Sequence, residues 1–174
     1  MKKSFFSTIP GHRLLKTGLL LAGCLAALHA NAQKPEWIPV AELLVGSMGH
    51  ADPGRMTEVL NRCTALNMTL SGMLAEDSPD MSEGYQNQAL KLIQSGILIS
   101  MNTEKEVSGI EPDINLFSDN AIATVKGLLP NYSAWLSNNY DDNGSYFDND
   151  FEIEMKGCEL ASKLVSQMTA SKSF

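Results

Sequence analysis

The sequence predicts an all-α fold: a small bundle of four main helices with short extra helices. Apolar residues recur three or four positions apart over long stretches, which is the spacing of one face of an α-helix. Alternation with a period of two, which marks a half-buried strand, does not continue beyond four or five residues anywhere in the chain. Cys63 and Cys158 fall on the apolar faces of the first and last of these stretches. Both sulfurs are therefore expected to face the core.

The first main helix is expected from Asp52 to about Ala75. Asp52 is a suitable N-cap, and Pro53 suits the first helical turn. One apolar stripe follows, made of Met56, Val59, Leu60, Cys63, Leu66, Asn67, Leu70, Met73 and Leu74. The segment EDSPDMSEG then interrupts the helical spacing.

The second main helix is expected to start at Ser78-Pro79 or at Ser82 and to end near Met101. Its apolar positions include Tyr85, Ala89, Leu92, Ile93 and Ile97. The segment NTEKEVSGIEPD, residues 102–113, is polar and contains Gly109 and Pro112, so it is predicted to be a link.

The third helix is expected to begin near Asp113 or Ser118 and to break at Pro130, because proline removes a helical hydrogen bond. A short helix resumes through Tyr132 and Trp135.

The last helix is expected from about Asp150. Ahead of the main helices, residues 33–51 form an N-terminal segment with a possible short helix at residues 40–48, and residues 52–174 form the bundle domain.

Residues 1–32 have the features of a secretory signal peptide: four basic residues, an apolar run from Gly18 to Leu28, and small residues at Ala30 and Ala32. The short lysine-led start is typical of bacteria, so we expect a periplasmic or secreted protein. The alternative is a lipoprotein anchored through Cys24, because residues 21–24, LAGC, resemble a bacterial lipobox. The apolar run is too short to span a bilayer, and no other stretch is long enough.

The chain after this leader is strongly acidic. It keeps nine of the 13 basic residues and all 20 acidic ones, which gives a net charge of −11. Nucleic acid and anionic membrane are poor partners for such a surface.

The two cysteines that remain, in a chain bound for an oxidising compartment, predict one disulfide between Cys63 and Cys158.

The segment NYDDNGSYFDND, residues 139–150, resembles the calcium loop of an EF-hand. With Gly144 at the sixth position, the ligands would be Asn139, Asp141, Asn143, the Ser145 carbonyl and Asp150. Asn139 stands where a charged carboxylate is expected, and Asp150 where a longer glutamate is usual. The alternative is an ordinary turn, because Asn and Asp favour turns and Gly144 supplies a positive φ. Asp148, Asn149 or Asp150 would then cap the last helix.

Catalytic chemistry is not expected. His50 is the one histidine after the leader, and Ser47, His50 and Asp52 lie too close in the chain to form a catalytic triad. A zinc site needs three or four ligands, which one histidine and two paired cysteines do not supply. Apart from a possible calcium ion, we expect no cofactor.

Aromatic residues gather in sequence around the acidic segment. Trp135, Tyr140, Tyr146 and Phe147 form a possible recognition patch for a basic peptide or a sugar, although aromatic residues at helical spacing also serve as core. We therefore expect a non-enzymatic helical protein of the bacterial envelope that binds a protein, peptide or small ligand. The alternatives are a calcium-binding protein that uses residues 139–150, and an acid-stress or holding chaperone.

Overall fold

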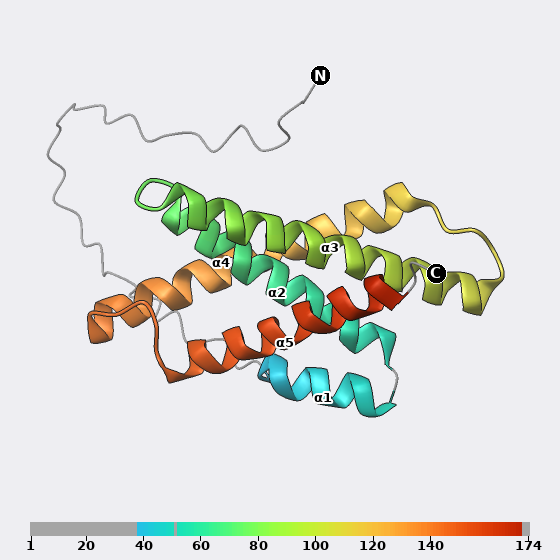
Figure 1. The fold of residues 1–174 in the computed structure, drawn as a ribbon, viewed down its shortest axis with the longest axis horizontal. Helices are drawn as coiled ribbons and strands as arrows, with labels where there is room; N and C mark the ends of the chain where they lie inside the picture. Colours follow the sequence, from blue (N-terminus) through green and yellow to red (C-terminus); the bar gives the residue numbers. More distant parts are fainter. Residues whose placement is uncertain (1–37, 51, 172–174) are drawn as a thin grey trace, which may run out of the picture. The chain divides into compact units, whose positions relative to one another are not determined.

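The computed structural model describes residues 38–50 and 52–171, and this part of the chain consists of helices and the short connections between them (Figure 1). The predicted leader, which includes Cys24, lies outside the described residues. The five helices are α1 (Val40–His50), α2 (Pro53–Leu74), α3 (Pro79–Ser108), α4 (Ile114–Asn143) and α5 (Asn149–Ser171). The predicted all-α class, with four main helices and a short extra one, is confirmed.

The start of α2 follows from Asp52 and Pro53. The Asp52 carboxylate accepts hydrogen bonds from the backbone N–H groups of Gly54 and Arg55, at 3.0 and 3.2 Å. These N–H groups have no partner inside the helix, so the capping side chain stabilises its first turn. The predicted beginning of the first main helix is confirmed.

Helix α2 is the centre of the bundle, because it packs against all four other helices. Every residue from Val59 to Asn67 is buried. The sequence predicted a single apolar stripe, whereas the middle of α2 is covered on all sides. Thr64 and Ala65 are small enough to let neighbouring helices approach the faces that this stripe does not cover.

Helix α3 is longer than the sequence predicted. Residues 102–108, expected to be part of a link, continue the helix to Ser108. Gly109 then ends it in the left-handed conformation, with φ of 69°, and donates its N–H to the Lys105 carbonyl at 2.9 Å. Polar composition does not distinguish an exposed helix from a loop, and Glu104, Lys105 and Glu106 are good helix formers.

Helix α4 runs without interruption through Pro130, so the predicted break there is wrong. Proline removes the N–H that the Lys126 carbonyl would accept. Both Pro130 and Lys126 lie on the exposed side of the helix, where water can hydrate that carbonyl. Buried residues on the other side, including Tyr132 and Leu136, hold the helix against the core.

Helix α5 begins after Asp148, whose carboxylate accepts a hydrogen bond from the Phe151 N–H at 2.7 Å. Asp148 is thus the capping residue among the three that the sequence offered.

Further along α5, Gly157 lies against the first turn of α1: a Cβ atom there would lie 2.8 Å from the Ala41 nitrogen and 2.9 Å from Val40 Cγ1. The absence of a side chain at Gly157 allows α1 and α5 to pack closely.

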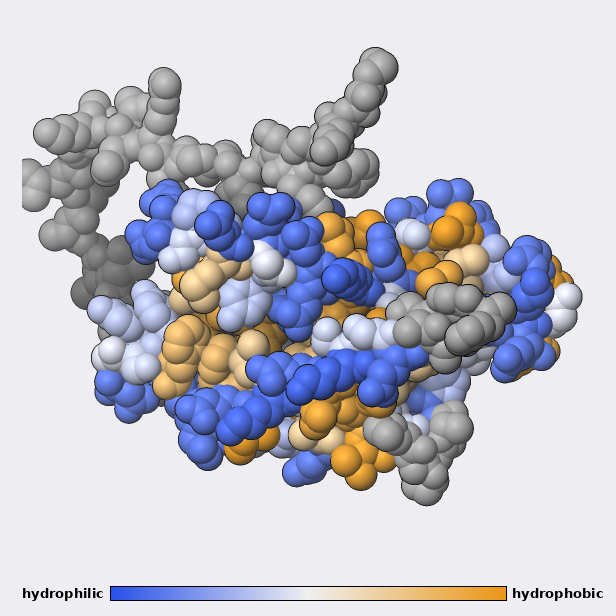
Figure 2. All heavy atoms as spheres, viewed as in Figure 1, coloured by the Kyte–Doolittle hydropathy of each residue, from blue (hydrophilic) through white to orange (hydrophobic). Residues whose placement is uncertain are grey.

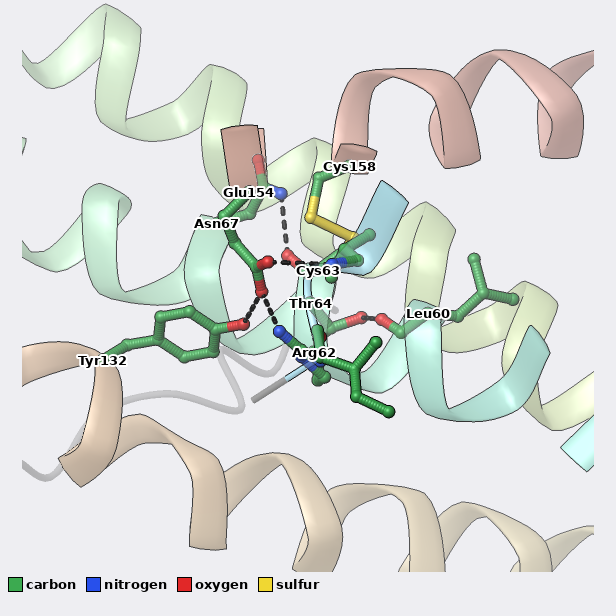
Figure 3. Close-up of a disulfide and its surroundings, with 10 residues drawn as sticks. Leu60, Arg62, Cys63, Thr64, Asn67, Tyr132, Glu154 and Cys158 are labelled. Carbon is green, nitrogen blue, oxygen red and sulfur yellow. Dashed lines mark hydrogen bonds and ion pairs between the residues drawn. A yellow bond between two sulfur atoms is a disulfide. The ribbon is translucent and has the colours of Figure 1, made fainter. Parts of the chain in front are cut away.

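The predicted disulfide joins α2 to α5, the first and last main helices (Figure 3). Cys63 and Cys158 are fully buried, and their Cα atoms lie 5.3 Å apart. The predicted pairing is confirmed, and a disulfide suits an oxidising compartment.

Among the described residues, none of the helices is both long and apolar enough to cross a membrane.

Candidate functional site

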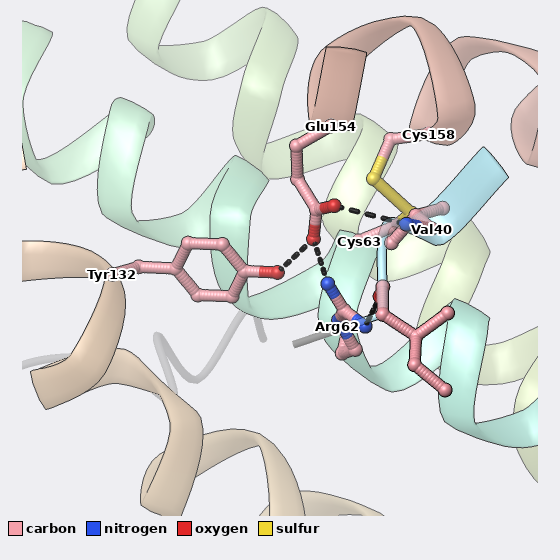
Figure 4. A network of polar contacts seen from close by, with 7 residues as sticks. Val40, Arg62, Cys63, Tyr132, Glu154 and Cys158 are labelled. Carbon is pink, nitrogen blue, oxygen red and sulfur yellow. Dashed lines mark hydrogen bonds and ion pairs between the residues drawn. A yellow bond between two sulfur atoms is a disulfide. The ribbon is translucent and has the colours of Figure 1, made fainter. Parts of the chain in front are cut away.

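Glu154 of α5 is buried where the helices meet, and its carboxylate accepts hydrogen bonds from three other helices (Figure 4). The Arg62 guanidinium of α2 donates to Oε1 at 2.5 Å, and the Tyr132 hydroxyl of α4 donates to the same oxygen at 2.7 Å. The Val40 N–H, at the start of α1, donates to Oε2 at 3.0 Å. Arg62 also donates to the Ile38 carbonyl at 2.6 Å. We call these groups the buried polar network.

The environment of the network shifts the pKa of two of its members upward. Burial raises the pKa of Tyr132 well above its ordinary value, and the nearby negative charge of Glu154 raises it further. Burial alone would lower the pKa of Arg62, but the attraction of Glu154 outweighs this effect, and the pKa of Arg62 is raised. Tyr132 therefore stays protonated and Arg62 stays charged throughout the ordinary pH range.

The buried polar network was missed by the sequence analysis, although one signal for it was present. On α5, Glu154 stands in the stripe of buried residues made by Phe151, Cys158, Ala161 and Val165, at the helical spacing. An acidic residue inside an apolar stripe needs a buried partner. Arg62 gave no comparable signal, because it lies outside the apolar stripe that was recognised on α2. The groups bond to one another, so we interpret the network as a structural connection between helices.

The proposed calcium ligands lie partly on a helix. Residues 139–143 form the last turn of α4, and Gly144 ends it with φ of 69°. Successive positions on an α-helix are about 100° apart, so Asp141 lies on the opposite side of α4 from Asn139 and Asn143. Asn139 is nearly buried, and its amide nitrogen donates to the Tyr146 carbonyl at 3.2 Å. The positions that an EF-hand would bring to one ion therefore point in different directions.

The remaining two proposed ligands lie beyond the end of α4. The Ser145 hydroxyl bonds to the backbone of Phe147 two residues on, as in the ordinary turn that the sequence also allowed. Asp150 is exposed in the first turn of α5. Within the described residues, no three His, Cys, Asp or Glu side chains form a group that could hold a metal ion. Calcium binding through the mixed Asn and Asp set remains a prediction.

Three aromatic side chains are exposed at the connection between α4 and α5. The rings of Tyr140 and Tyr146 stack with their centroids 4.5 Å apart, and Phe147 lies 6.4 Å from Tyr146. Phe147 also packs on the buried Phe151, at 4.5 Å. Trp135, the fourth member of the predicted patch, is only 5% exposed, so it belongs to the core. We call Tyr140, Tyr146 and Phe147 the aromatic patch.

A groove of about 420 Å³ between α2 and α4 ends at the aromatic patch, because Tyr146 is one of its lining residues. Gly72 leaves the α2 side open: a Cβ atom placed there would meet nothing within 4 Å. Apolar and hydroxyl side chains both line the groove. It is formed by Met68, Thr69, Gly72 and Met73 of α2, and Leu129, Ser133, Leu136 and Ser137 of α4. We call it the α2–α4 groove.

Acidic residues surround this end of the bundle. The α2–α3 turn and the α4–α5 connection lie at the same end, on the left in Figure 1. We call this region the acidic end; its residues are Glu76, Asp77, Asp80, Asp141, Asp142 and Asp148. No lysine or arginine occurs in residues 63–90 or 127–155, the stretches that form the groove and both connections.

The sequence analysis thus found the aromatic patch and the acidic segment but not the α2–α4 groove. Its walls come from residues about 60 positions apart in the chain, which no local pattern relates. Comparison of the chain with protein-family models, with curated proteins and with solved structures gave no match.

Proposed function

We propose that this protein is an exported, non-enzymatic binding protein of the bacterial envelope, and that it holds a segment of another protein in the α2–α4 groove. The observation that carries the proposal is the exposed aromatic patch at the mouth of that groove. Tyr140 and Phe147 are 49% and 52% exposed. Tyrosine and phenylalanine provide large contact areas at low entropic cost, and they are enriched at protein interfaces.

The lining of the groove favours a peptide segment. Met68 and Met73 have flexible side chains that adapt to differently shaped apolar groups. Ser133 and Ser137 place hydroxyl groups one turn apart on α4, where they can bond to the polar groups of a bound chain. Figure 2 shows that hydrophobic residues reach the surface between hydrophilic ridges on one face, so apolar contacts are accessible on this bundle.

Export is proposed from the predicted leader, and the buried disulfide supports it. A bridge between Cys63 and Cys158 persists in the periplasm or outside the cell but is rarely kept in the bacterial cytoplasm. Treating intact cells with a membrane-impermeant protease and fractionating the periplasm will locate the protein. Recovery of the reduced chain in the cytoplasm would contradict this part of the proposal.

The binding function is tested with a displayed library of random peptides. We expect the protein to enrich peptides that lose binding in the variant Gly72→Leu, because the added side chain would occupy the groove. The backbone position tolerates a side chain, since a Cβ atom there meets nothing within 4 Å. Gly127→Leu is the matched control. Gly127 lies on α4 two positions before Leu129, hence on the side away from the groove, and it also has open space around it. Absence of enriched peptides, or equal binding by both variants, would overturn the proposal.

A further inference from the structure

We infer that the occupant of the α2–α4 groove is a cationic peptide segment, in which an apolar side chain enters the groove while lysine or arginine residues meet the aromatic patch and the acidic end. This inference rests on the proposed function, since it names the chemistry of the bound segment. It follows from the charge around the groove, from the exposed aromatic faces and from the volume and apolar lining of the groove.

The charge around the groove has one sign. Its two walls and the connections beside them come from residues 63–90 and 127–155, which contain no basic residue. Asp141 and Asp142 follow Tyr140 in the last turn of α4, and both side chains are exposed. A surface charge of one sign attracts a partner of the opposite sign and repels one of the same sign. An acidic segment is therefore excluded and a basic one favoured.

The aromatic patch adds a contact that is specific for cations. Tyr140 and Tyr146 stack on each other, and Tyr140 remains 49% exposed, so part of its ring is available to a ligand. An ammonium or guanidinium group above a tyrosine ring is attracted by the negative face of the ring. The carboxylates of the acidic end attract the same positive charge, so the two effects act in the same direction.

The groove requires an apolar group in the same segment. A volume of about 420 Å³ accommodates a large aliphatic or aromatic side chain together with part of its backbone. Met68, Met73 and Leu136 provide apolar contacts inside it. Charge alone would give a weak and unselective association, whereas burial of one side chain fixes the register of the segment.

The test uses three displayed peptide libraries with identical randomised apolar positions. The remaining positions are fixed as lysine in the first library, glutamine in the second and glutamate in the third. Selection is carried out at low salt on the chain that follows the predicted leader, residues 33–174, and every enriched peptide is tested again on Gly72→Leu and Gly127→Leu. We expect binders that need an open groove to come from the lysine library.

A charge variant of the protein then tests the acidic end directly. In the double variant Asp141→Asn, Asp142→Asn, the side chains keep their shape but lose two negative charges. We expect a lysine-library peptide to bind about tenfold more weakly to this variant, since each exposed pair contributes modestly and the two act together. The same peptide should also bind more weakly as the salt concentration rises.

The outcomes separate this inference from the proposed function. If the glutamine library yields equally strong binders that Gly72→Leu abolishes, the groove binds peptides but the cationic assignment is wrong. If no library yields a binder that depends on the groove, both proposals fail. Binding of a neutral oligosaccharide that requires Tyr140 and displaces the lysine peptides would also overturn the assignment, because it would make a sugar the occupant.

Discussion

The buried polar network, together with the disulfide and Gly157 beside it on α5, forms a region that we call the junction. The junction and the acidic end both contain carboxylates and tyrosines but use them in opposite ways. At the junction, Glu154 and Tyr132 are both buried, and the Tyr132 hydroxyl donates a hydrogen bond to the Glu154 carboxylate. At the acidic end, Asp141 and Asp142 are exposed, and Tyr140 stacks on Tyr146 with much of its surface open. The junction therefore holds the fold together, whereas the acidic end keeps its polar and aromatic groups available for a partner.

This difference predicts where substitutions affect stability. At the junction, a disulfide, a buried ion pair and a close helix contact lie on neighbouring turns of α5, at Cys158, Glu154 and Gly157. Each should carry a measurable part of the free energy of unfolding. Exposed substitutions at the acidic end should change this free energy little and act mainly on binding.

The largest effect is expected when the disulfide is removed. The bridge closes a loop with a sequence separation of 95, so the double variant Cys63→Ala, Cys158→Ala should lose about 4 kcal/mol of unfolding free energy. Urea unfolding followed by circular dichroism measures this loss. Wild-type protein unfolded in the presence of a reducing agent is the control and should resemble the variant. A loss below about 1 kcal/mol would show that the junction does not depend on the bridge.

The ion pair between Arg62 and Glu154 should come next. Each side chain is only 5% exposed, so Glu154→Ala leaves a buried guanidinium without its carboxylate, and we expect a loss of about 3 to 4 kcal/mol. The double variant Arg62→Met, Glu154→Leu should recover most of it, because it leaves no buried charge. Urea unfolding of both variants checks this.

A control for this prediction lies on the same helix. Lys156 and Glu152 form an exposed ion pair at 3.5 Å, and Lys156→Ala should cost less than about 1 kcal/mol. If Glu154→Ala were as mild as Lys156→Ala, the buried polar network would not be a structural connection.

The hydroxyl of Tyr132 should have a smaller effect that depends on pH. Tyr132→Phe removes a hydrogen bond to a carboxylate, so it should cost about 2 kcal/mol at neutral pH. The pKa of Tyr132 is raised in the folded protein, so its contribution is complete below the ordinary tyrosine pKa of about 10 and is lost as the pH rises above it. The stability difference between wild type and variant should therefore narrow above pH of about 10. Urea unfolding at several alkaline pH values measures this, and a constant difference would contradict the expected sign.

The sequence was sufficient wherever a feature depends on neighbouring residues or on simple pairing. Asp52 with Pro53 predicted the start of α2, and two cysteines on apolar faces predicted the disulfide. The break expected at Pro130 was wrong because the cost of a proline depends on whether its helix is held elsewhere, and Tyr132 and Leu136 hold α4 to the core. Local rules cannot include such tertiary contacts.

The site was predicted only in part, for the same reason. The aromatic patch was visible because its members lie within eight residues of one another. The α2–α4 groove and the pairing of Arg62 with Glu154 were not, because each brings together residues that are far apart in the chain; the ion pair spans 92 positions. Trp135 was assigned to the patch because sequence spacing does not reveal which side of α4 is covered.

The smallest effect on stability is expected from adding one methyl group at the junction. In Gly157→Ala the new Cβ atom meets the backbone of α1, which cannot move away as a flexible side chain can, and we expect a loss of about 1 to 2 kcal/mol. Gly84→Ala on α3 is the matched control. It adds the same methyl group in open space, so it should stabilise the protein slightly through its helix propensity. Thermal unfolding of both variants tests this difference in sign; stabilisation by both would mean that α1 does not pack tightly on α5.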